Sequence, residues 1–419
     1  MIRVCSIFSQ LLQLFPRTEF EAAVKQHRAH RHARGFECWT QFVAMLFCHL
    51  GRAQSLREIC GGLAATEGKL KHLGIGRAPS RSTLAYANEH RPWALFQTVF
   101  QQLLVRCQQV AHAEKKRFRF RNPLLSIDST LIALSLSAFD WATYQREKGA
   151  AKLHLILDHQ GYLPKFAVLT EGKGSDLALA RTLRFAPGTI LVFDRGYQDY
   201  RWFERLTAQD VFFVTRLRCH AHIEVLQDHP VRSGGSILRD QTVRLGSQRY
   251  QMKTDLRLIE AQDADSGQSI LLVTNNFRLA ASTISQIYRD RWEIEVFFRA
   301  LKQNLRVKTF VGTSANAVHI QIWTALIAML LLKFLQLRAS FAWSLSNLVA
   351  LLRHQLFVYR DLWAWINAPF EPPLSPQNNC PWPSDSPMLD SKTGNLDRPP
   401  PICRLQPHET QGGLWPKSV

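Results

Sequence analysis

The stretch from residue 288 to residue 302 carries four side chains that could together act on a phosphodiester. They are a phenol, a guanidinium, a carboxylate and an amine, from Tyr288, Arg291, Glu295 and Lys302. At about 100° per residue, all four would share one narrow stripe of a helix. A carboxylate flanked by cations and a phenol could hold a metal ion and a phosphate side by side. Glu293 would point away from this stripe, so it is not expected to take part.

A single helix is predicted for this stretch because it contains neither Gly nor Pro and its apolar residues share the face opposite the stripe. These apolar residues are Ile294, Phe297, Phe298, Leu301 and Leu305. Trp292 and Arg299 would lie beside the polar stripe. The alternative is an ordinary solvated helix whose charges pair at i,i+4 spacing. The stretch alone does not decide between the two.

Two further carboxylates occur in positions that are predicted to be buried. Asp128 lies inside the apolar run Leu124–Leu136, and Asp194 directly follows a second apolar run, Thr189–Phe193. Both runs are predicted to be strands, and residues 152–170 between them are typical of a hairpin. A buried carboxylate without a partner is costly. Each acid therefore needs either an ion pair or a divalent cation.

The composition indicates a polyanionic partner. Lys and Arg number 52 against 33 Asp and Glu, which gives a net charge of +19 over 419 residues. Nucleic acid is the usual partner of such a basic protein, and an anionic membrane surface is the weaker alternative. The longest apolar run, Ile322–Leu332, falls short of the roughly 20 residues that cross a bilayer, so it is predicted to be a buried core helix. The cysteines lack C-x-x-C spacing and are expected to be free thiols.

Three regions are predicted along the chain. Residues 1–113 show helical periodicity and carry two basic clusters, the first of which could equally be a solvated loop. Residues 114–365 alternate strands and helices, with a β-rich insertion over about 211–276. Residues 366–419 hold most of the prolines and few aliphatic residues, so this tail is predicted to be disordered. Ser80 is a candidate N-cap for a helix whose start could bind a backbone phosphate.

The order of the acids resembles that of a known family. An acid on a first strand, a hairpin, an acid after a fourth strand and an acid on a later helix is the layout of ribonuclease-H-like polynucleotidyl transferases. Asp128 in SIDST, Asp194 in FDRGY and Glu295 resemble the DDE triad of IS4-family insertion-sequence transposases. The stripe matches that family's signature, Tyr-x2-Arg-x3-Glu-x6-Lys, at every position. The segments FECWTQFVAMLF, SLREIC and SRSTLAYANEHRPW resemble the N-terminal DNA-binding region of one IS4 branch.

This resemblance implies an α/β fold, with a ribonuclease-H-like catalytic core that contains an all-β insertion and follows an all-α N-terminal DNA-binding domain. It implies a DNA transposase that binds the ends of its insertion sequence, cleaves them by metal-dependent phosphodiester hydrolysis and joins the 3′-OH ends to target DNA. Such an enzyme would carry out cut-and-paste transposition. The alternatives are another ribonuclease-H-like nuclease and a degenerate transposase that acts as a DNA-binding regulator.

The resemblance also implies the catalytic residues and their cofactor. Asp128, Asp194 and Glu295 would bind two Mg²⁺ or Mn²⁺ ions, with Asp128 between the two. Hard cations of this kind prefer oxygen ligands, which three carboxylates supply.

Further implied roles concern DNA and location. Tyr288, Arg291 and Lys302 would hold phosphates, and Trp292 and Arg299 would lie against the DNA. Trp292 could stack on a flipped base or could pack in the core. The expected partners are double-stranded DNA, both the inverted repeats and the target, and a second copy of the chain, with no membrane. A bacterial cytoplasmic, nucleoid-associated location is implied.

Overall fold

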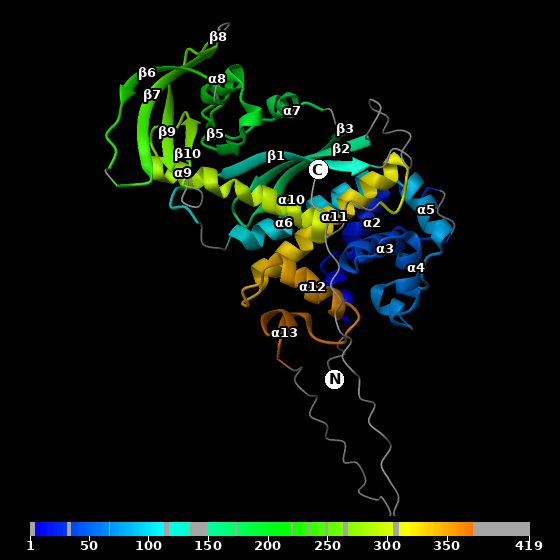
Figure 1. Cartoon of the computed structure of the whole chain (residues 1–419). Coiled ribbons are helices and arrows are strands. Elements are labelled where there is room, and N and C mark those ends of the chain that lie inside the picture. Colours follow the sequence, from blue (N-terminus) through cyan, green and yellow to red (C-terminus); the bar gives the residue numbers. More distant parts are fainter. Residues whose placement is uncertain are drawn as a thin grey trace, which may run out of the picture. The chain divides into compact units, whose positions relative to one another are not determined.

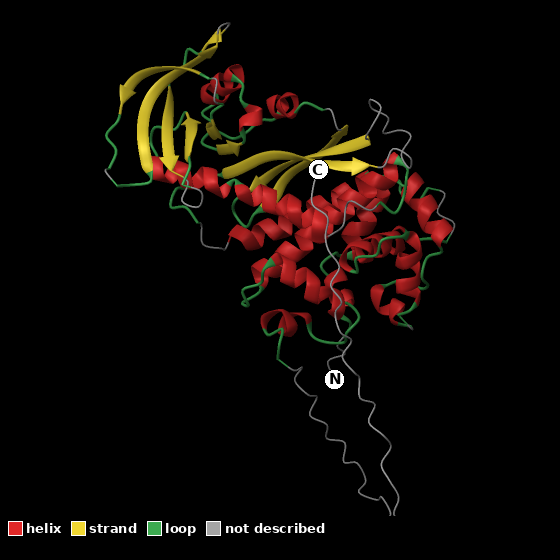
Figure 2. Ribbon diagram, in the orientation of Figure 1, coloured by secondary structure: helices red, strands yellow, loops and turns green. Residues whose placement is uncertain are grey.

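The computed structural model describes residues 5–31, 35–66, 68–112, 117–134, 149–171, 174–218, 221–232, 234–247, 250–262, 267–304 and 310–371. These residues belong to one compact unit, Met1–Pro373. The predicted Pro-rich tail lies outside the described residues from position 372 onward. Figures 1 and 2 show one continuous sheet, with the N-terminal and C-terminal helices gathered together beside it.

Ten strands form the sheet. In chain order they are β1 (Leu124–Leu134), β2 (Gly149–Asp158), β3 (Leu163–Glu171), β4 (Ile190–Phe193), β5 (Phe212–Arg216), β6 (His222–Asp228), β7 (Ile237–Ser247), β8 (Tyr250–Gln251), β9 (Leu256–Gln262) and β10 (Ser269–Thr274). Their spatial order is β3-β2-β1-β4-β5-β10-β9-β7-β6, with β8 paired to β7. β1 pairs antiparallel with β2 and parallel with β4, and β4 pairs parallel with β5. The order of β1–β5 is that of a ribonuclease-H-like core, as the sequence predicted.

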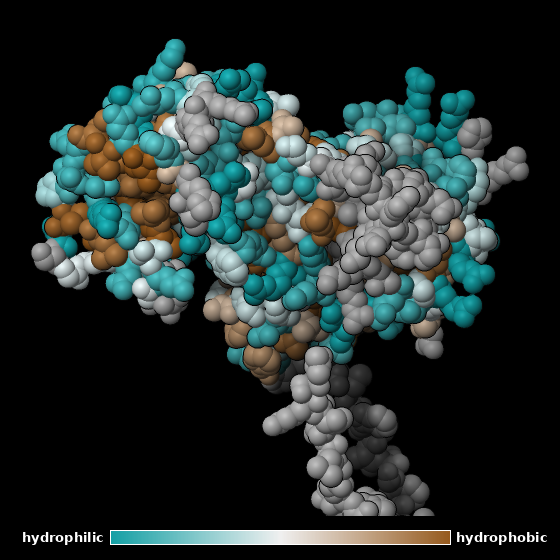
Figure 3. All heavy atoms as spheres, turned by 45° about the horizontal axis from the view of Figure 1, so that its top comes forward, coloured by the Kyte–Doolittle hydropathy of each residue, from teal (hydrophilic) through white to brown (hydrophobic). Residues whose placement is uncertain are grey.

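The β-rich extension differs from its predicted bounds. β5 belongs with the core strands because it pairs parallel with β4, so the added strands are β6–β10 rather than everything from residue 211. β10 returns to pair antiparallel with β5, which makes the extension part of the same sheet. The pattern of apolar and polar residues along a strand does not show which strand it pairs with. For this reason β5 was predicted to belong to the extension. Apolar side chains are exposed here, among them Val225, Leu226 and Leu238, and Figure 3 shows apolar surface over this part.

The α-helices are α1 (Ile7–Leu12), α2 (Arg17–Gln26), α3 (Cys38–Leu50), α4 (Leu56–Ala64), α5 (Arg81–His90), α6 (Ala94–His112), α7 (Asp176–Thr182), α8 (Tyr200–Ala208), α9 (Ala281–Asp290), α10 (Trp292–Asn304), α11 (Ala315–Arg338), α12 (Leu345–Gln355) and α13 (Leu362–Asn367), with short 3-10 helices η1 (Lys69–Leu73) and η4 (Arg195–Tyr197). Helical structure over the described residues before position 113 agrees with the prediction. The sequence did not predict α8, whose apolar face is narrow.

Both faces of β4 are buried. Ile190 and Val192 pack in the cluster that contains the apolar face of α9, whereas Leu191 and Phe193 pack in the cluster that contains α8. Successive side chains of a strand point to opposite faces, so a strand covered on both sides needs an uninterrupted apolar sequence. This explains the run before Asp194 and gives that acid a rigid support.

Helix α11 forms the centre of the largest core. The predicted run Ile322–Leu332 is buried throughout, but the helix starts earlier, at Ala315. By length and composition α11 could cross a membrane, yet 83% of its most apolar window is buried inside the protein. It packs against α3, α5, α6 and α12, so helices from both ends of the chain share one core. Of the cysteines in the described ranges, all five are free thiols, as expected.

Candidate active site and nucleic-acid interface

The register of β1 and β4 places two of the predicted acids side by side. Ile127 of β1 lies opposite Phe193, the last residue of β4, in a parallel pair. Asp128 follows Ile127, and Asp194 follows Phe193. Neighbouring strands lie about 4.8 Å apart. The negative charge of Asp194 is one cause that raises the pKa of Asp128, after the larger effect of burial. The two acids that lie 66 positions apart in the sequence thus meet at one edge of the core.

Asp194 is fixed by the turn that follows it. Its side chain caps η4 by accepting a hydrogen bond from the backbone N–H of Gly196 at 2.9 Å. A Cβ atom added to Gly196 would lie 2.9 Å from Oδ1 of Asp194, closer than such contacts occur. The hydroxyl of Thr215, on β5, donates to the carbonyl of Asp194 at 3.2 Å. The glycine in FDRGY therefore leaves room for the carboxylate.

The helix predicted for residues 288–302 is interrupted at Arg291. α9 ends at Asp290 and α10 begins at Trp292, so the prediction of one continuous helix was wrong. Arg291 keeps helical dihedral angles, but its N–H donates to the carbonyl of Tyr288 at 3.2 Å, and the N–H of Ile294 donates to the carbonyl of Arg291 at 3.1 Å. These are three-residue spacings, which tighten the turn. The apolar face is as predicted for the four buried residues Ile294, Phe297, Phe298 and Leu301, and Leu305 lies outside the described residues.

Arg291 links the first and third acids. Its guanidinium lies 2.6 Å from Oε1 of Glu295 and 3.7 Å from Oδ2 of Asp128, and its side chain is 13% exposed. The backbone N–H of Ser129 donates to Asp128 at 2.7 Å. Burial nevertheless raises the pKa of Asp128 to about 7, helped by the charges of Asp194 and Glu295 and opposed by Ser129 and Arg291. Arg291 therefore lies between Asp128 and Glu295, and the charges of Asp194 and Glu295 both act on Asp128.

The donor set suits a hard divalent cation, because it consists of carboxylate oxygens only. Within the described ranges, however, no three His, Cys, Asp or Glu side chains converge closely enough to hold a metal ion as they stand. Arg291 occupies a position between Asp128 and Glu295 and supplies positive charge there.

The residues predicted to contact DNA lie on α9, at the break between α9 and α10, and along α10. Trp292 is 50% exposed, so the alternative that it packs in the core was wrong. Arg299 lies over the Trp292 ring at 5.6 Å, and Arg291 lies over the Tyr288 ring at 5.6 Å. Tyr288, Arg291 and Trp292 line a pocket of about 530 Å³. Lys302 is half-buried on α10.

Glu293 is not among the charges that shift the pKa of Asp128. Its charge acts on Arg117, Tyr162 and Lys333, and it lines the same pocket as Tyr288, Arg291 and Trp292.

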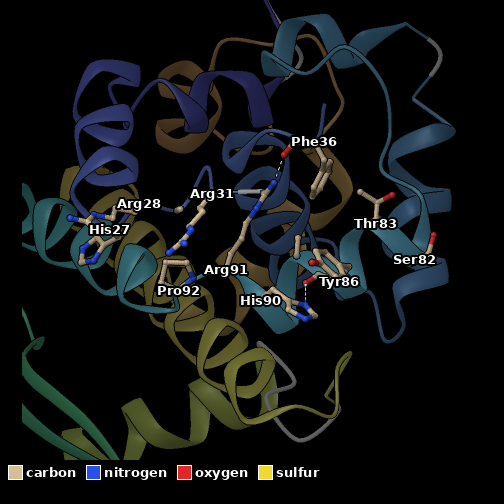
Figure 4. Close-up of a pocket in the computed structure, with 12 residues that line it drawn as sticks. His27, Arg28, Arg31, Phe36, Ser82, Thr83, Tyr86, His90, Arg91 and Pro92 are labelled. Carbon is tan, nitrogen blue, oxygen red and sulfur yellow. Dashed lines mark hydrogen bonds between the residues drawn. The ribbon is translucent and has the colours of Figure 1, made fainter. Parts of the chain in front are cut away.

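A second candidate site lies among the N-terminal helices. Two segments distant in sequence line one pocket of about 1030 Å³, namely residues 27–31 after α2 and residues 82–92 of α5 and the turn that follows (Figure 4). Arg28 and Arg31 are exposed on the first segment. On the second, Tyr86 is 56% exposed and its ring stacks on that of His90 at 4.0 Å. The predicted N-cap is present, because Ser80 accepts from the N–H of Thr83.

Arg91, which lines this pocket, has a structural role. Arg91 is 7% exposed and donates to the carbonyls of Phe36 and Glu37 and to Oε1 of Gln41. These bonds tie the start of α3 to the end of α5. The first basic cluster is thus partly a pocket wall and not simply a solvated loop, although residues 32–34 lie outside the described ranges.

Sequence reasoning missed several residues around these sites. Gly196 was visible in FDRGY, but its role depends on a distance that spacing cannot give. In the sequence, Asp290 is a charged residue outside the polar stripe and His159 is part of a turn. Their side chains form a hydrogen bond that no spacing predicts. Tyr86 had no signal beyond its place in an amphipathic segment.

Comparisons with known proteins agree with this geometry. A family model described as "Transposase DDE domain" matches residues 119–331, and a domain of unknown function, DUF4372, matches residues 4–76. A protein of Sinorhizobium fredii that is named as a transposase is 30% identical over 77% of this chain and 90% of its own length. The named transposase of insertion sequence IS5377 from Geobacillus stearothermophilus is 31% identical over 61% of this chain and 67% of its own. A protein of Synechocystis that is named as a transposase of insertion sequence IS4SA is 23% identical over 57% of this chain and 67% of its own length.

The chain is therefore a DDE transposase, an enzyme that acts on DNA. Within that class it belongs to the IS4 family of insertion-sequence transposases. Domains of this class generally use divalent metal ions.

Proposed function

We propose that this transposase binds the two ends of its insertion sequence, cleaves them by metal-dependent hydrolysis and joins the 3′-OH ends to target DNA, by cut-and-paste transposition. The proposal is supported by the β1–β4 register, which puts Asp128 next to Asp194, and by the contacts of Arg291 with Asp128 and Glu295. These acids come from β1, from the end of β4 and from α10, which is the arrangement the resemblance implies. The intact acids speak against a degenerate regulator.

Asp128, Asp194 and Glu295 would hold two Mg²⁺ or Mn²⁺ ions. Such ions activate water as a nucleophile and stabilise charge on the phosphate and the leaving oxygen. The chain's own residues supply the ligands and their placement. Gly196 leaves space for Asp194, and Ser129 orients Asp128 through its backbone N–H. Arg291 balances the charge of the acids and can turn to a phosphate when cations neutralise them.

Around this centre, Tyr288, Arg291 and Lys302 would hold the phosphates that flank the scissile one. Trp292 and Arg299 offer a planar stack on the surface, because the guanidinium lies over an indole that is half exposed. An exposed indole beside a basic pocket suits an unstacked base. The second copy needed to hold two ends together is part of the proposal, as is association with the nucleoid.

The predicted division into a DNA-binding region over 1–113 and a catalytic region over 114–365 is also proposed here, and the basic lining of the N-terminal pocket supports it. Arg28 and Arg31 suit phosphates, which fix a protein on DNA without reading its sequence. Ser82 and Tyr86 project from α5 and suit contacts with base edges and faces. Binding by the first pair would depend on salt, and recognition by the second pair would depend on sequence.

The experiment is a binding and cleavage assay on duplexes that carry the element's own ends, with Mg²⁺ and a scrambled duplex for comparison. Native protein should nick the end and join it to a second duplex. The double variant Arg28→Ala/Arg31→Ala should weaken binding to both duplexes. The slope of log affinity against log salt concentration should become less steep by about two phosphate contacts. Tyr86→Ala should reduce the preference for the end over the scrambled duplex.

Arg232→Ala is the matched control, since this exposed arginine lies in the turn between β6 and β7. It should change neither the salt dependence nor the sequence preference. Absence of metal-dependent nicking by native protein would contradict the proposed reaction. Unchanged binding by the paired arginine variant would remove the pocket from the DNA interface.

A further inference from the structure

A chain of buried hydrogen bonds lies beside the candidate active site and has no part in the mechanism above. Oγ of Ser126 lies 2.7 Å from Nε2 of His159, and Nδ1 of the same ring lies 2.5 Å from Oδ2 of Asp290. Ser126 is fully buried, and the side chains of His159 and Asp290 are 5% and 1% exposed. The three residues come from β1, from the turn between β2 and β3, and from the end of α9.

Two further side chains complete the surroundings of Asp290. The hydroxyl of Tyr162 lies 3.2 Å from each of its carboxylate oxygens, and Arg117 forms an ion pair with it. Arg117 also donates to the Tyr162 oxygen at 3.0 Å. Asp290 is thus surrounded by a ring nitrogen, a phenol and a guanidinium, which offset the cost of burying its charge.

The order Ser–His–Asp is that of a hydrolytic triad. Ser126 cannot act as a nucleophile, because the residue has no exposed surface and a substrate cannot reach its oxygen. The hydrogen bonds instead join three elements of the fold. The backbone N–H of His159 adds a further bond, to the carbonyl of Leu124 on β1 at 3.0 Å.

Both ends of this chain of bonds adjoin the candidate catalytic residues. Ser126 and Asp128 are two residues apart on β1, so their side chains point to the same face of the sheet. Asp290 directly precedes Arg291, whose guanidinium contacts Asp128 and Glu295. Asp290 is the last residue of α9, and Arg291 is the residue at the break. Holding Asp290 therefore restrains the point at which α9 stops and α10 begins.

We propose that Ser126, His159 and Asp290 are positioning residues that hold the α9–α10 junction against β1 and thereby place Arg291 and Glu295 beside Asp128. The interruption at Arg291 then has a cause, because Asp290 is drawn toward the β2–β3 turn by His159 and Tyr162. The effect on cleavage rests on the proposed function, whereas the effect on the junction rests on the fold alone.

The test compares two variants of His159 in the full-length protein. His159→Asn keeps an amide N–H close to the position of Nδ1 and so retains the bond to Asp290. His159→Phe keeps a ring and loses both bonds. Backbone hydrogen exchange at residues 290–294 should be about tenfold faster in His159→Phe, and the increase should be smaller in His159→Asn, which loses only the bond to Ser126. Single-turnover cleavage of bound end DNA should fall about tenfold in His159→Phe and less in His159→Asn, with an unchanged Kd for DNA.

His49→Phe is the matched control, because His49 is also buried and lies 3.0 Å from Oγ1 of Thr324, on α3 and α11. It should lower the unfolding temperature without changing exchange at the junction or the cleavage rate. Native exchange in His159→Phe would overturn the proposal, and so would exchange and cleavage in His159→Asn that equal those of His159→Phe. If native protein does not cleave end DNA, the proposed function fails, and hydrogen exchange alone still decides this inference.

Discussion

At the scale of single residues, the site is defined by Asp128, which lies beside Asp194 and shares the guanidinium of Arg291 with Glu295. The sequence could identify Asp128 and Asp194 because a carboxylate inside or directly after an apolar run must have a partner. It could not show that Arg291 reaches both Asp128 and Glu295, since a helical wheel gives direction without distance. For the same reason it could not show that Gly196 touches the Asp194 carboxylate.

Gly196 gives the first prediction at this scale. Gly196→Ala should push the carboxylate of Asp194 aside, because the new Cβ would lie 2.9 Å from Oδ1. A displacement of this kind in a catalytic group can cost up to roughly 100-fold in rate. We expect the cleavage rate of end DNA to fall at least about tenfold while binding persists. Gly61→Ala is the control, because nothing lies within 4 Å of a Cβ at that position on α4. A native cleavage rate in Gly196→Ala would show that Asp194 does not need its observed position.

Asp128 gives a prediction for pH. Burial raises its pKa from the ordinary 3.8 to about 7, so in metal-free protein the folded state favours the protonated acid. The stability that this provides is complete below about pH 4 and is lost as the pH rises through 7. The free energy of unfolding of native protein, measured in EDTA by urea titration, should therefore fall relative to Asp128→Asn over this range. Parallel pH profiles for the two proteins would contradict the raised pKa.

At the scale of elements, the acids are positioned by β1, β4 and the broken helix α9–α10. The strands and the hairpin could be predicted because alternation and uninterrupted apolar runs report burial directly. The break at Arg291 could not be predicted, because the sequence there contains neither Gly nor Pro. Its cause is the tertiary environment of Asp290. The membership of β5 in the core could not be predicted either, because pairing is a property of the whole sheet.

Trp292 gives the prediction for α10. Trp292→Ala should weaken binding of end DNA about tenfold, since stacking of one base on an aromatic ring contributes roughly 1–3 kcal/mol. Trp292→Phe should retain part of that affinity, because the smaller ring still offers a stacking face. Val296→Ala, an exposed apolar change on the same helix, should leave the affinity unchanged in a fluorescence anisotropy titration. Equal affinities for Trp292→Ala and Val296→Ala would remove the indole from the interface.

At the scale of the whole molecule, the N-terminal helices share their apolar core with the C-terminal helices. α3, α5 and α6 pack on α11, and one apolar core contains residues of both α1 and α13. The sequence suggested a boundary near residue 113 because the pattern there changes from helices to strands. Periodicity cannot show that two such regions share a core, since that depends on which buried faces meet.

This shared core predicts that residues 114–371 do not fold alone. Removing residues 1–113 would expose the buried faces of α11 that contact α3 and α6, and apolar exposure costs about 25 cal/mol per Å². The fragment should lack a cooperative thermal transition by circular dichroism, whereas residues 1–371 should show one. A cooperative transition in the shorter fragment would restore the view of two independent domains.

The central claim is that Asp128, Asp194 and Glu295 form one metal-dependent centre for DNA cleavage. The most direct measurement is single-turnover nicking of an end duplex in Mg²⁺ by native protein and by Asp128→Asn, Asp194→Asn and Glu295→Gln, with Kd for the duplex measured alongside. We predict that each substitution lowers the rate by at least about 1000-fold and leaves Kd within about threefold. Nicking at the native rate by any one of the three variants would contradict the assignment of that residue.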